Sequence, residues 1–171
     1  MKKNQKGFSL IELLIVVAII LIIAAIAIPN LLRARMAANE SSAVGSVRTI
    51  VTSSVAYSST WGSGFPTTLA TLGGAGTGAA TCTAAGLIDP VLAAGSKSGY
   101  MFVLTGDALY TGGSCGTVGS NTFAVYGDPI TVGTTGQRAF CSDESGVVRQ
   151  DPTGAATPGT DKACQALVAL Q

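Results

Sequence analysis

The sequence predicts an α+β chain in which one long N-terminal helix, membrane-spanning in its first half, packs on a small antiparallel β-sheet. An unbroken apolar run from Leu13 to Ile28 indicates the membrane-spanning part. Apolar residues at helical spacing then continue as far as Val55. From Tyr100 onwards, short segments rich in β-branched and aromatic residues alternate with Gly, Pro and Asp. Together these patterns favour a helix layer on a sheet layer.

The apolar run is long enough to cross a bilayer. From Phe8 to Ile28 only Ser9 and Glu12 are polar. At about 1.5 Å per residue, these roughly 21 residues form a helix of about 30 Å, which is the thickness of a bilayer core. Glu12 is the exception, because a carboxylate inside a membrane helix costs about 3 kcal/mol unless it is neutralised.

Charge is concentrated before this run. Lys2, Lys3 and Lys6 precede it, and the positive-inside rule therefore places the N-terminus in the cytoplasm. Removing these three from ten basic residues leaves seven against nine acidic residues, a net charge of −2. Such a remainder is not basic enough to suggest nucleic-acid binding. The absence of histidine excludes the usual zinc sites and histidine-based acid–base catalysis.

Two simpler interpretations of the N-terminus fit less well. A cleaved secretory signal peptide has a shorter apolar core and an Ala-x-Ala site after it, and no such site follows Ile28. A plain signal anchor leaves Glu12 unexplained.

The segment Lys6-Gly7-Phe8-Ser9-Leu10-Ile11-Glu12, followed by the apolar run, resembles the N-terminus of type IV prepilins and type II secretion pseudopilins. The resemblance implies the pilin fold, cleavage between Gly7 and Phe8 by a membrane prepilin peptidase, and N-methylation of Phe8. It makes Glu12 the acidic assembly residue and Pro29 the proline that kinks the helix. It divides the chain into a leader (1–7), a long helix (8–58, with 8–28 in the membrane) and a globular domain (59–171).

This processing has a physical rationale. A residue without a side chain at Gly7 lets a peptidase approach the scissile bond closely. Cleavage removes the three lysines and leaves a new α-ammonium at Phe8. In a filament this ammonium and the Glu12 carboxylate of a neighbouring subunit would neutralise each other. Breaking a buried pair of this kind costs about 3–5 kcal/mol.

The helix is expected to continue past Pro29, although a proline lacks an amide hydrogen and the alternative is a helix that stops there. Val44, Val47, Val51 and Val55 form an apolar stripe of helical period that would face the sheet. One helix to about Ser58 follows from this pattern. The charged residues of this stretch are expected on solvated faces: Arg33, Arg35, Glu40 and Arg48.

The rest of the chain predicts short elements. A break at Trp61–Pro66 precedes a short helix at Thr67–Leu72, and Asp89-Pro90 indicates a turn or a helix cap. Four strands are expected at 100–104, 122–126, 137–141 and 146–150. Gly127-Asp128-Pro129 should end the second strand, and 106–120 should be a loop that holds Cys115. The run Gly-x-Arg-x-Phe-Cys-x-Asp-x-x-Gly-Val-Val-Arg at 136–149 also resembles the globular ends of bacterial pilin-like proteins.

Four cysteines in a region expected to be exported indicate two disulfides, while metal binding is the competing interpretation. No Cys-x-x-Cys spacing supports a metal. Three pairings are open, and we favour Cys141–Cys164 with Cys82–Cys115. Each would contribute about 3 kcal/mol.

No catalytic constellation is evident, so the chain is not expected to be an enzyme. Asp143 and Glu144 are adjacent, and we expect a turn with two solvated acids rather than a catalytic pair. No cofactor or metal is expected. Calcium is the alternative, since some pseudopilins bind it near the C-terminus, with oxygens from Asp128, Asp143, Glu144 and Asp151.

The sequence therefore predicts a structural subunit of a type IV pilus-like filament. Its expected partners are further copies of itself, other pilins, the prepilin peptidase and the assembly platform of the inner membrane. It would span that membrane once before assembly and then lie in an extracellular or periplasmic filament. A type II secretion pseudopilin is the alternative, and a membrane-anchored binding domain or enzyme is a third.

Overall fold

The fold is described from a computed structural model, which covers residues 8–74, 78–106, 109–110, 112–113, 115, 119–155 and 161–170. The chain forms two compact units, Met1–Arg35 and Met36–Gln171. One helix begins in the first unit and ends in the second.

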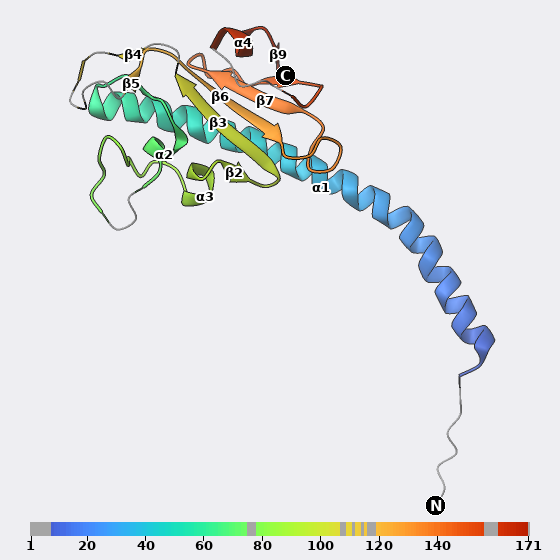
Figure 1. Ribbon diagram of the computed structural model, residues 1–171. Helices are drawn as coiled ribbons and strands as arrows, with labels where there is room; N and C mark the ends of the chain where they lie inside the picture. Colours follow the sequence, from blue (N-terminus) through green and yellow to red (C-terminus); the bar gives the residue numbers. More distant parts are fainter. Residues whose placement is uncertain are drawn as a thin grey trace, which may run out of the picture. The chain divides into compact units, whose positions relative to one another are not determined.

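The helices and strands follow one another in the order shown in Figure 1. The helices are α1 (Leu10–Trp61), α2 (Leu69–Leu72), α3 (Pro90–Ala93) and α4 (Asp161–Gln165). The strands are β1 (Phe65–Pro66), β2 (Ser96–Lys97), β3 (Tyr100–Gly106), β4 (Leu109–Tyr110), β5 (Gly119–Ser120), β6 (Phe123–Pro129), β7 (Ala139–Asp143), β8 (Arg149–Asp151) and β9 (Val168–Ala169).

Helix α1 includes Pro29, so a helix that stops at this proline is the wrong alternative. A proline inside a helix removes one backbone hydrogen bond, and the other bonds of a long helix sustain it. The helix continues to Trp61, three residues beyond the expected end. Gly62 ends it with a φ of +59°, and its amide donates to the Ser58 carbonyl at 2.9 Å.

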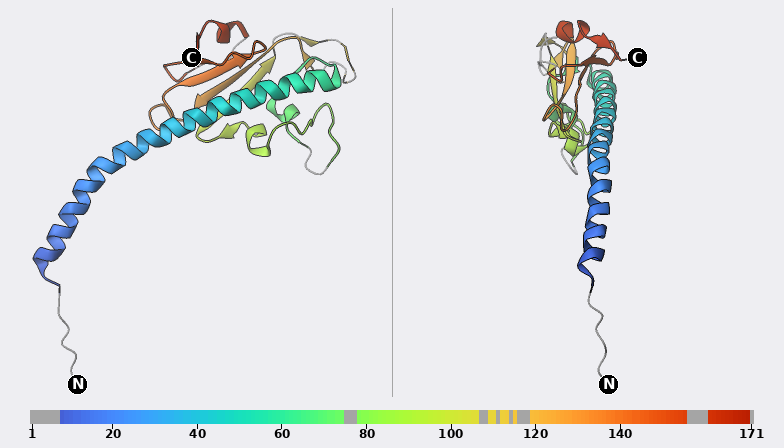
Figure 2. Two further views of the ribbon diagram at one scale, coloured as in Figure 1. Left: turned by 180° about the vertical axis from the view of Figure 1, so that it is seen from behind. Right: turned by 90° about the vertical axis from the view of Figure 1, so that its right-hand side faces the viewer.

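The second unit has two layers, α1 residues 36–61 and an antiparallel sheet in the order β2-β3-β6-β7-β8-β9. In the end-on view of Figure 2 the sheet lies on one side of this part of the helix. The predicted α+β architecture, a long N-terminal helix packed on an antiparallel sheet, is thus confirmed. The predicted antiparallel meander is also present, because β3 pairs with β6, β6 with β7 and β7 with β8.

The core lies between these layers. Val47 and Ile50 of α1 are fully buried, together with Phe123 and Phe140 of the sheet. Val55 is 46% exposed, so the predicted valine stripe is wrong at its end. The buried stripe of α1 contains Val47 and Val51 but also residues that a search for valines does not find: Glu40, Ala43, Ser46, Ile50, Ser53, Ser54 and Tyr57.

The predicted strands exist with different ends. The second strand ends at Pro129, three residues later than expected, because Gly127, Asp128 and Pro129 belong to β6 and pair with the start of β3. Pro129 is tolerated there because it is the last residue of the strand. β7 and β8 each end later than expected, at Asp143 and Asp151.

The expected loop at 106–120 contributes a second sheet. β4 and β5 pair, and β5 also pairs with β1, which gives the order β1-β5-β4. Gly119 allows this approach, because a Cβ at this position would overlap the Ser63 carbonyl. These strands have two residues each, which is too short for a periodic pattern to reveal them.

The outer face of the large sheet carries a smaller cluster, in which the Cys141–Cys164 disulfide attaches α4 to β7. Cys82–Cys115 is the other disulfide, so the structure contains the pairing that we favoured.

Asp143 is the last residue of β7, and its side chain is fully buried. The expectation of two solvated acids is therefore wrong for Asp143, whose Oδ1 accepts hydrogen bonds from the amide and hydroxyl of Ser145. It is correct for Glu144, which is exposed.

Candidate processing and assembly site

The first unit presents an apolar surface. Its large side chains between Leu10 and Leu32 are exposed by about half or more, with Leu10 at 79% and Ile26 at 66%. Among the described residues, α1 is the one helix that is long and apolar enough to cross a membrane. Exposed apolar area of this size requires a lipid or protein environment, because it is unfavourable in water.

The start of α1 places Glu12 beside the position where a mature chain would begin. The amide of Ser9 donates to Glu12 Oε2 at 2.9 Å, and the amide of Leu13 donates to the Ser9 carbonyl at 3.3 Å. Ser9 is thus the residue before the helix, and Glu12 is the third residue within it. The carboxylate lies at the positive end of the helix dipole, which stabilises its charge.

The structure places only some of the predicted site residues together. Gly7 lies outside the described residues. Phe8 directly precedes the Ser9–Glu12 pair and is 84% exposed. Pro29 is far along the same helix and takes no part in the arrangement at Glu12. The Ser-x-x-Glu spacing is a sequence signature of a helix start, so this bond was predictable from Ser9 and Glu12.

A second polar site joins α1 to the sheet within the Met36–Gln171 unit. Glu40 Oε1 accepts from the amides of Gln137 (2.9 Å) and Arg138 (3.2 Å). Its Oε2 accepts from Arg138 Nε at 3.0 Å and Nη2 at 2.7 Å. Nη1 of Arg138 donates to Gln150, and the guanidinium lies 5.6 Å from the centre of the Phe140 ring.

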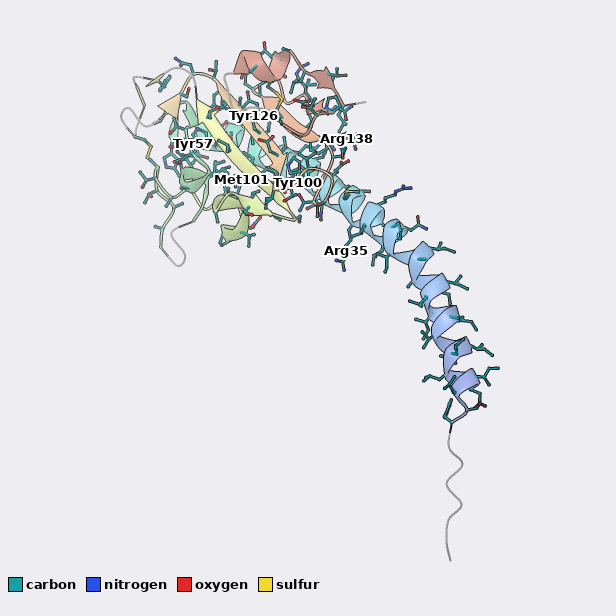
Figure 3. All side chains as sticks on the ribbon, turned by 45° about the vertical axis from the view of Figure 1, so that its right-hand side comes forward. Arg35, Tyr57, Tyr100, Met101, Tyr126 and Arg138 are labelled. Carbon is teal, nitrogen blue, oxygen red and sulfur yellow. A yellow bond between two sulfur atoms is a disulfide. The ribbon has the colours of Figure 1, made fainter. Side chains whose placement is uncertain are left out.

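Glu40 was expected on a solvated face, and this prediction is wrong because the residue is buried. The helical period through Ala43, Val47 and Ile50 passes through position 40, so the signal was present in the sequence. Arg33, Arg35 and Arg48 are exposed, as expected. Figure 3 shows Arg138 on the sheet side and Arg35 on the helix.

Two pKa values at this site are shifted. Burial alone would raise the pKa of Glu40, but hydrogen bonds from Gln137 and Arg138 and the charge of Arg138 outweigh burial. The pKa therefore lies below its ordinary value. Burial, and then the Glu40 charge, raise the pKa of the Tyr100 hydroxyl, which donates to the Arg138 carbonyl at 2.8 Å. Glu40 is thus charged and Tyr100 neutral at pH 7.

Three of the four acids considered for calcium lie on different strands, Asp128, Asp143 and Asp151, and Glu144 directly follows Asp143. Asp128 is in β6 opposite Met101, and Asp143 is bonded to Ser145. Asp151 Oδ1 accepts from the amide and hydroxyl of Thr153, each at 2.8 Å. Within the described part of the chain, no three Asp, Glu or Cys side chains gather where they could hold a metal ion.

Comparison with known proteins agrees with the N-terminal motif. The family model described as "Prokaryotic N-terminal methylation motif" matches residues 2–28. This match includes Gly7, Phe8 and Glu12 but none of the globular unit.

One similar protein is the type IV wide pilus major component PilA4 of Thermus thermophilus. The two chains are 68% identical over 38 residues, which are 22% of this chain and 29% of the relative. The match thus spans less than a third of the relative's length. No solved structure matches the chain. We conclude that this protein carries the prokaryotic N-terminal methylation motif and is partly homologous to a type IV pilin.

Proposed function

We propose that the protein is a structural subunit of a type IV pilus-like filament, which polymerises through the first half of α1. The observation that carries the proposal is the exposed apolar surface from Leu10 to Leu32, with Glu12 as its one charge. A bilayer covers this surface before assembly, and the same surface of other copies covers it afterwards. The similarity to a pilus major component over 38 residues supports a pilus over other membrane anchors.

Processing would precede polymerisation. On this proposal, prepilin peptidase cleaves after Gly7 in the leader 1–7, and Phe8 is then N-methylated. The mature chain consists of the long helix, predicted at 8–58 and extending to Trp61 in the structure, and of the globular part that follows it. Residues 8–28 of the helix lie in the inner membrane. The assembly platform of the inner membrane and other pilins are its further partners.

Glu12 would guide docking. Its Oε2 accepts from the Ser9 amide, while Oε1 has no hydrogen bond among the described residues. That oxygen is available to the α-ammonium of a second subunit, and the pair would neutralise two charges inside an apolar bundle. Pro29 would allow the helix to bend where subunits pack.

The proposal is tested with Glu12→Gln in the organism that makes the protein. We expect mature chains that begin with methylated Phe8, as measured by mass spectrometry, but few filaments in electron micrographs. Glu144→Gln is the matched control, because it removes an exposed acid from the globular unit and should leave filaments unchanged.

Three results would contradict the proposal. They are an uncleaved N-terminus, normal filaments with Glu12→Gln, and equal filament loss with Glu144→Gln. A deletion strain that keeps its surface filaments but fails to secrete proteins would identify a type II secretion pseudopilin instead.

A further inference from the structure

We propose that a pocket at the C-terminal end of α1 binds a neutral saccharide. The pocket has a volume of about 280 Å³, and its lining comes from four elements and the loops beside them. The lining residues that carry the argument are Ser58, Gly62, Gly64, Phe65, Tyr110 and Asn121. The proposal concerns the globular unit and does not depend on filament formation.

The pocket forms where the end of α1 and β1 meet two later strands, β4 and β5. Gly62 ends α1, and β1 then runs beside β5, which in turn pairs with β4. Gly64 has a φ of +76°, and a Cβ on it would lie 2.5 Å from the Ser120 carbonyl oxygen and 2.9 Å from Tyr110 Cβ. A larger residue would therefore push Tyr110 away from β1.

The aromatic part of the pocket is held in place. The Phe65 ring lies 4.8 Å from the Phe123 ring, centre to centre, and Phe123 is fully buried. Tyr110 is half-buried on β4, which is fixed by its pairing with β5. Aromatic faces next to polar groups are suited to ligands that have both apolar and polar surfaces.

The polar groups of the pocket are available to a ligand. Within the described residues, no protein group hydrogen-bonds the Asn121 amide, the Tyr110 hydroxyl or the Ser58 hydroxyl. The amide and the two hydroxyls can each donate and accept. None of the described lining residues carries a formal charge.

These features favour one class of ligand. The described lining offers no charged partner to an anion or a metal ion. A purely apolar ligand would leave the amide and hydroxyls without partners. A neutral sugar ring needs no charged partner and leaves no polar group of the lining unpaired. Its C–H face packs on an aromatic ring, and its hydroxyls exchange hydrogen bonds with Asn121, Tyr110 and Ser58. A single ring in so open a site should bind with a millimolar Kd.

The chain contains a natural reporter for this test. Trp61 is its one tryptophan, it directly precedes Gly62, and its ring lies 4.9 Å from that of Tyr57. The full chain is purified in a detergent without a sugar head group. Its Trp61 fluorescence is then followed during titration with methyl α-mannoside, methyl β-galactoside and methyl N-acetyl-β-glucosaminide. We expect a saturable change with at least one glycoside.

Variants assign the signal to the pocket. Asn121→Ala and Tyr110→Ala should each weaken binding about tenfold, and Tyr110→Phe, which keeps the ring, about threefold. Asn121 is exposed, so its variant retains the fold even where Tyr110→Ala does not. Thr134→Ala, at an exposed residue that does not line the pocket, is the matched control and should bind as the original protein does.

Two results would overturn the proposal. One is the absence of a saturable response to all three glycosides, and the other is a response that Asn121→Ala and Tyr110→Phe leave unchanged. A fluorescence change that follows protein concentration instead of glycoside would show that a second copy of the chain fills the pocket, which also contradicts a saccharide site.

Discussion

Glu40 connects the helix to the sheet by accepting four hydrogen bonds. Two come from the backbone amides of Gln137 and Arg138, and two come from the Arg138 guanidinium. A neutral amide at this position would offer one acceptor oxygen where the carboxylate offers two. The contact therefore depends on the charge of Glu40 and not only on its shape.

Glu40→Gln should lower the free energy of unfolding by about 2 kcal/mol, because hydrogen bonds to charged groups are worth about 1.5–3 kcal/mol. Urea denaturation of the full chain in detergent, followed by circular dichroism, measures this. Glu144→Gln should stay within about 0.5 kcal/mol, as exposed substitutions do. Equal effects of the two variants would show that Glu40 does not join the layers.

The same contact predicts a pH dependence. The pKa of Glu40 is lowered in the folded chain, so its contribution is present above the ordinary value of 4.5. The contribution is lost as the pH falls through the folded pKa. We therefore expect the free energy of unfolding to decrease below about pH 4.5, and this decrease should be smaller in Glu40→Gln. Parallel curves for the two proteins would contradict the assignment.

At the scale of single elements, α1 is not optimised as a helix in isolation. Gly45 is exposed in its middle, and a Cβ there would have no heavy atom within 4 Å. Gly136 is the opposite case, because a Cβ there would overlap the hydroxyl of Tyr100, which is fully buried.

Gly45→Ala should raise the free energy of unfolding by up to about 1 kcal/mol, since alanine is the better helix former. The matched substitution Gly136→Ala should lower it by about 1–3 kcal/mol, because the buried tyrosine cannot move aside freely. Both are measured by urea denaturation, and the same sign for both would contradict this description of the packing.

The two disulfides close loops of similar length, with sequence separations of 33 and 23 residues. Loop entropy alone would make each worth about 3 kcal/mol. Cys141 and Cys164 are fully buried, whereas Cys82 and Cys115 are half-buried. The Cys141→Ser/Cys164→Ser variant should therefore lose more stability than Cys82→Ser/Cys115→Ser, because it also places two hydroxyls in an apolar cluster. Equal losses in urea denaturation would indicate that loop entropy dominates.

At the scale of the whole molecule, the division at Met36 separates an apolar helix from a unit that has its own core. The core includes α1 residues 43–57 but none from the first unit. The stability of the globular unit and the proposed attachment to a membrane thus depend on different parts of the same helix.

A chain truncated to 36–171 should remain folded and soluble without detergent, with a cooperative urea transition. A chain truncated to 58–171 is the control, and it should lack this transition because it has lost Val47, Ile50 and Tyr57 from the core. Near-ultraviolet circular dichroism distinguishes the two outcomes. A disordered 36–171 fragment would show that the first unit contributes to folding.

Sequence patterns were sufficient where many residues repeat one signal. The apolar run, the strands of the meander and the cap at Asp89 all follow from local periodicity or spacing. Asp89 indeed accepts from the Leu92 amide at 2.9 Å at the start of α3. Such signals depend on the residues of one segment alone.

The patterns failed where a charged side chain is buried beside hydrogen-bond donors. Glu40 and Asp143 have the composition of surface residues, yet both are buried. Arg138, directly before β7, donates to Glu40, and Ser145 in the adjacent turn donates to Oδ1 of Asp143. The sheet β1-β5-β4 was missed because its strands contain two residues each.

The N-terminal part of this protein is thus determined by sequence alone. The long apolar run, its one carboxylate and the N-terminal methylation motif are all local features that need no tertiary contact. Only the tertiary structure decided how α1 attaches to the sheet, which residues bind the buried acids and where a pocket forms. These properties depend on residues far apart in the chain, such as Glu40 and Arg138 at a separation of 98 positions. No local pattern records which of them meet.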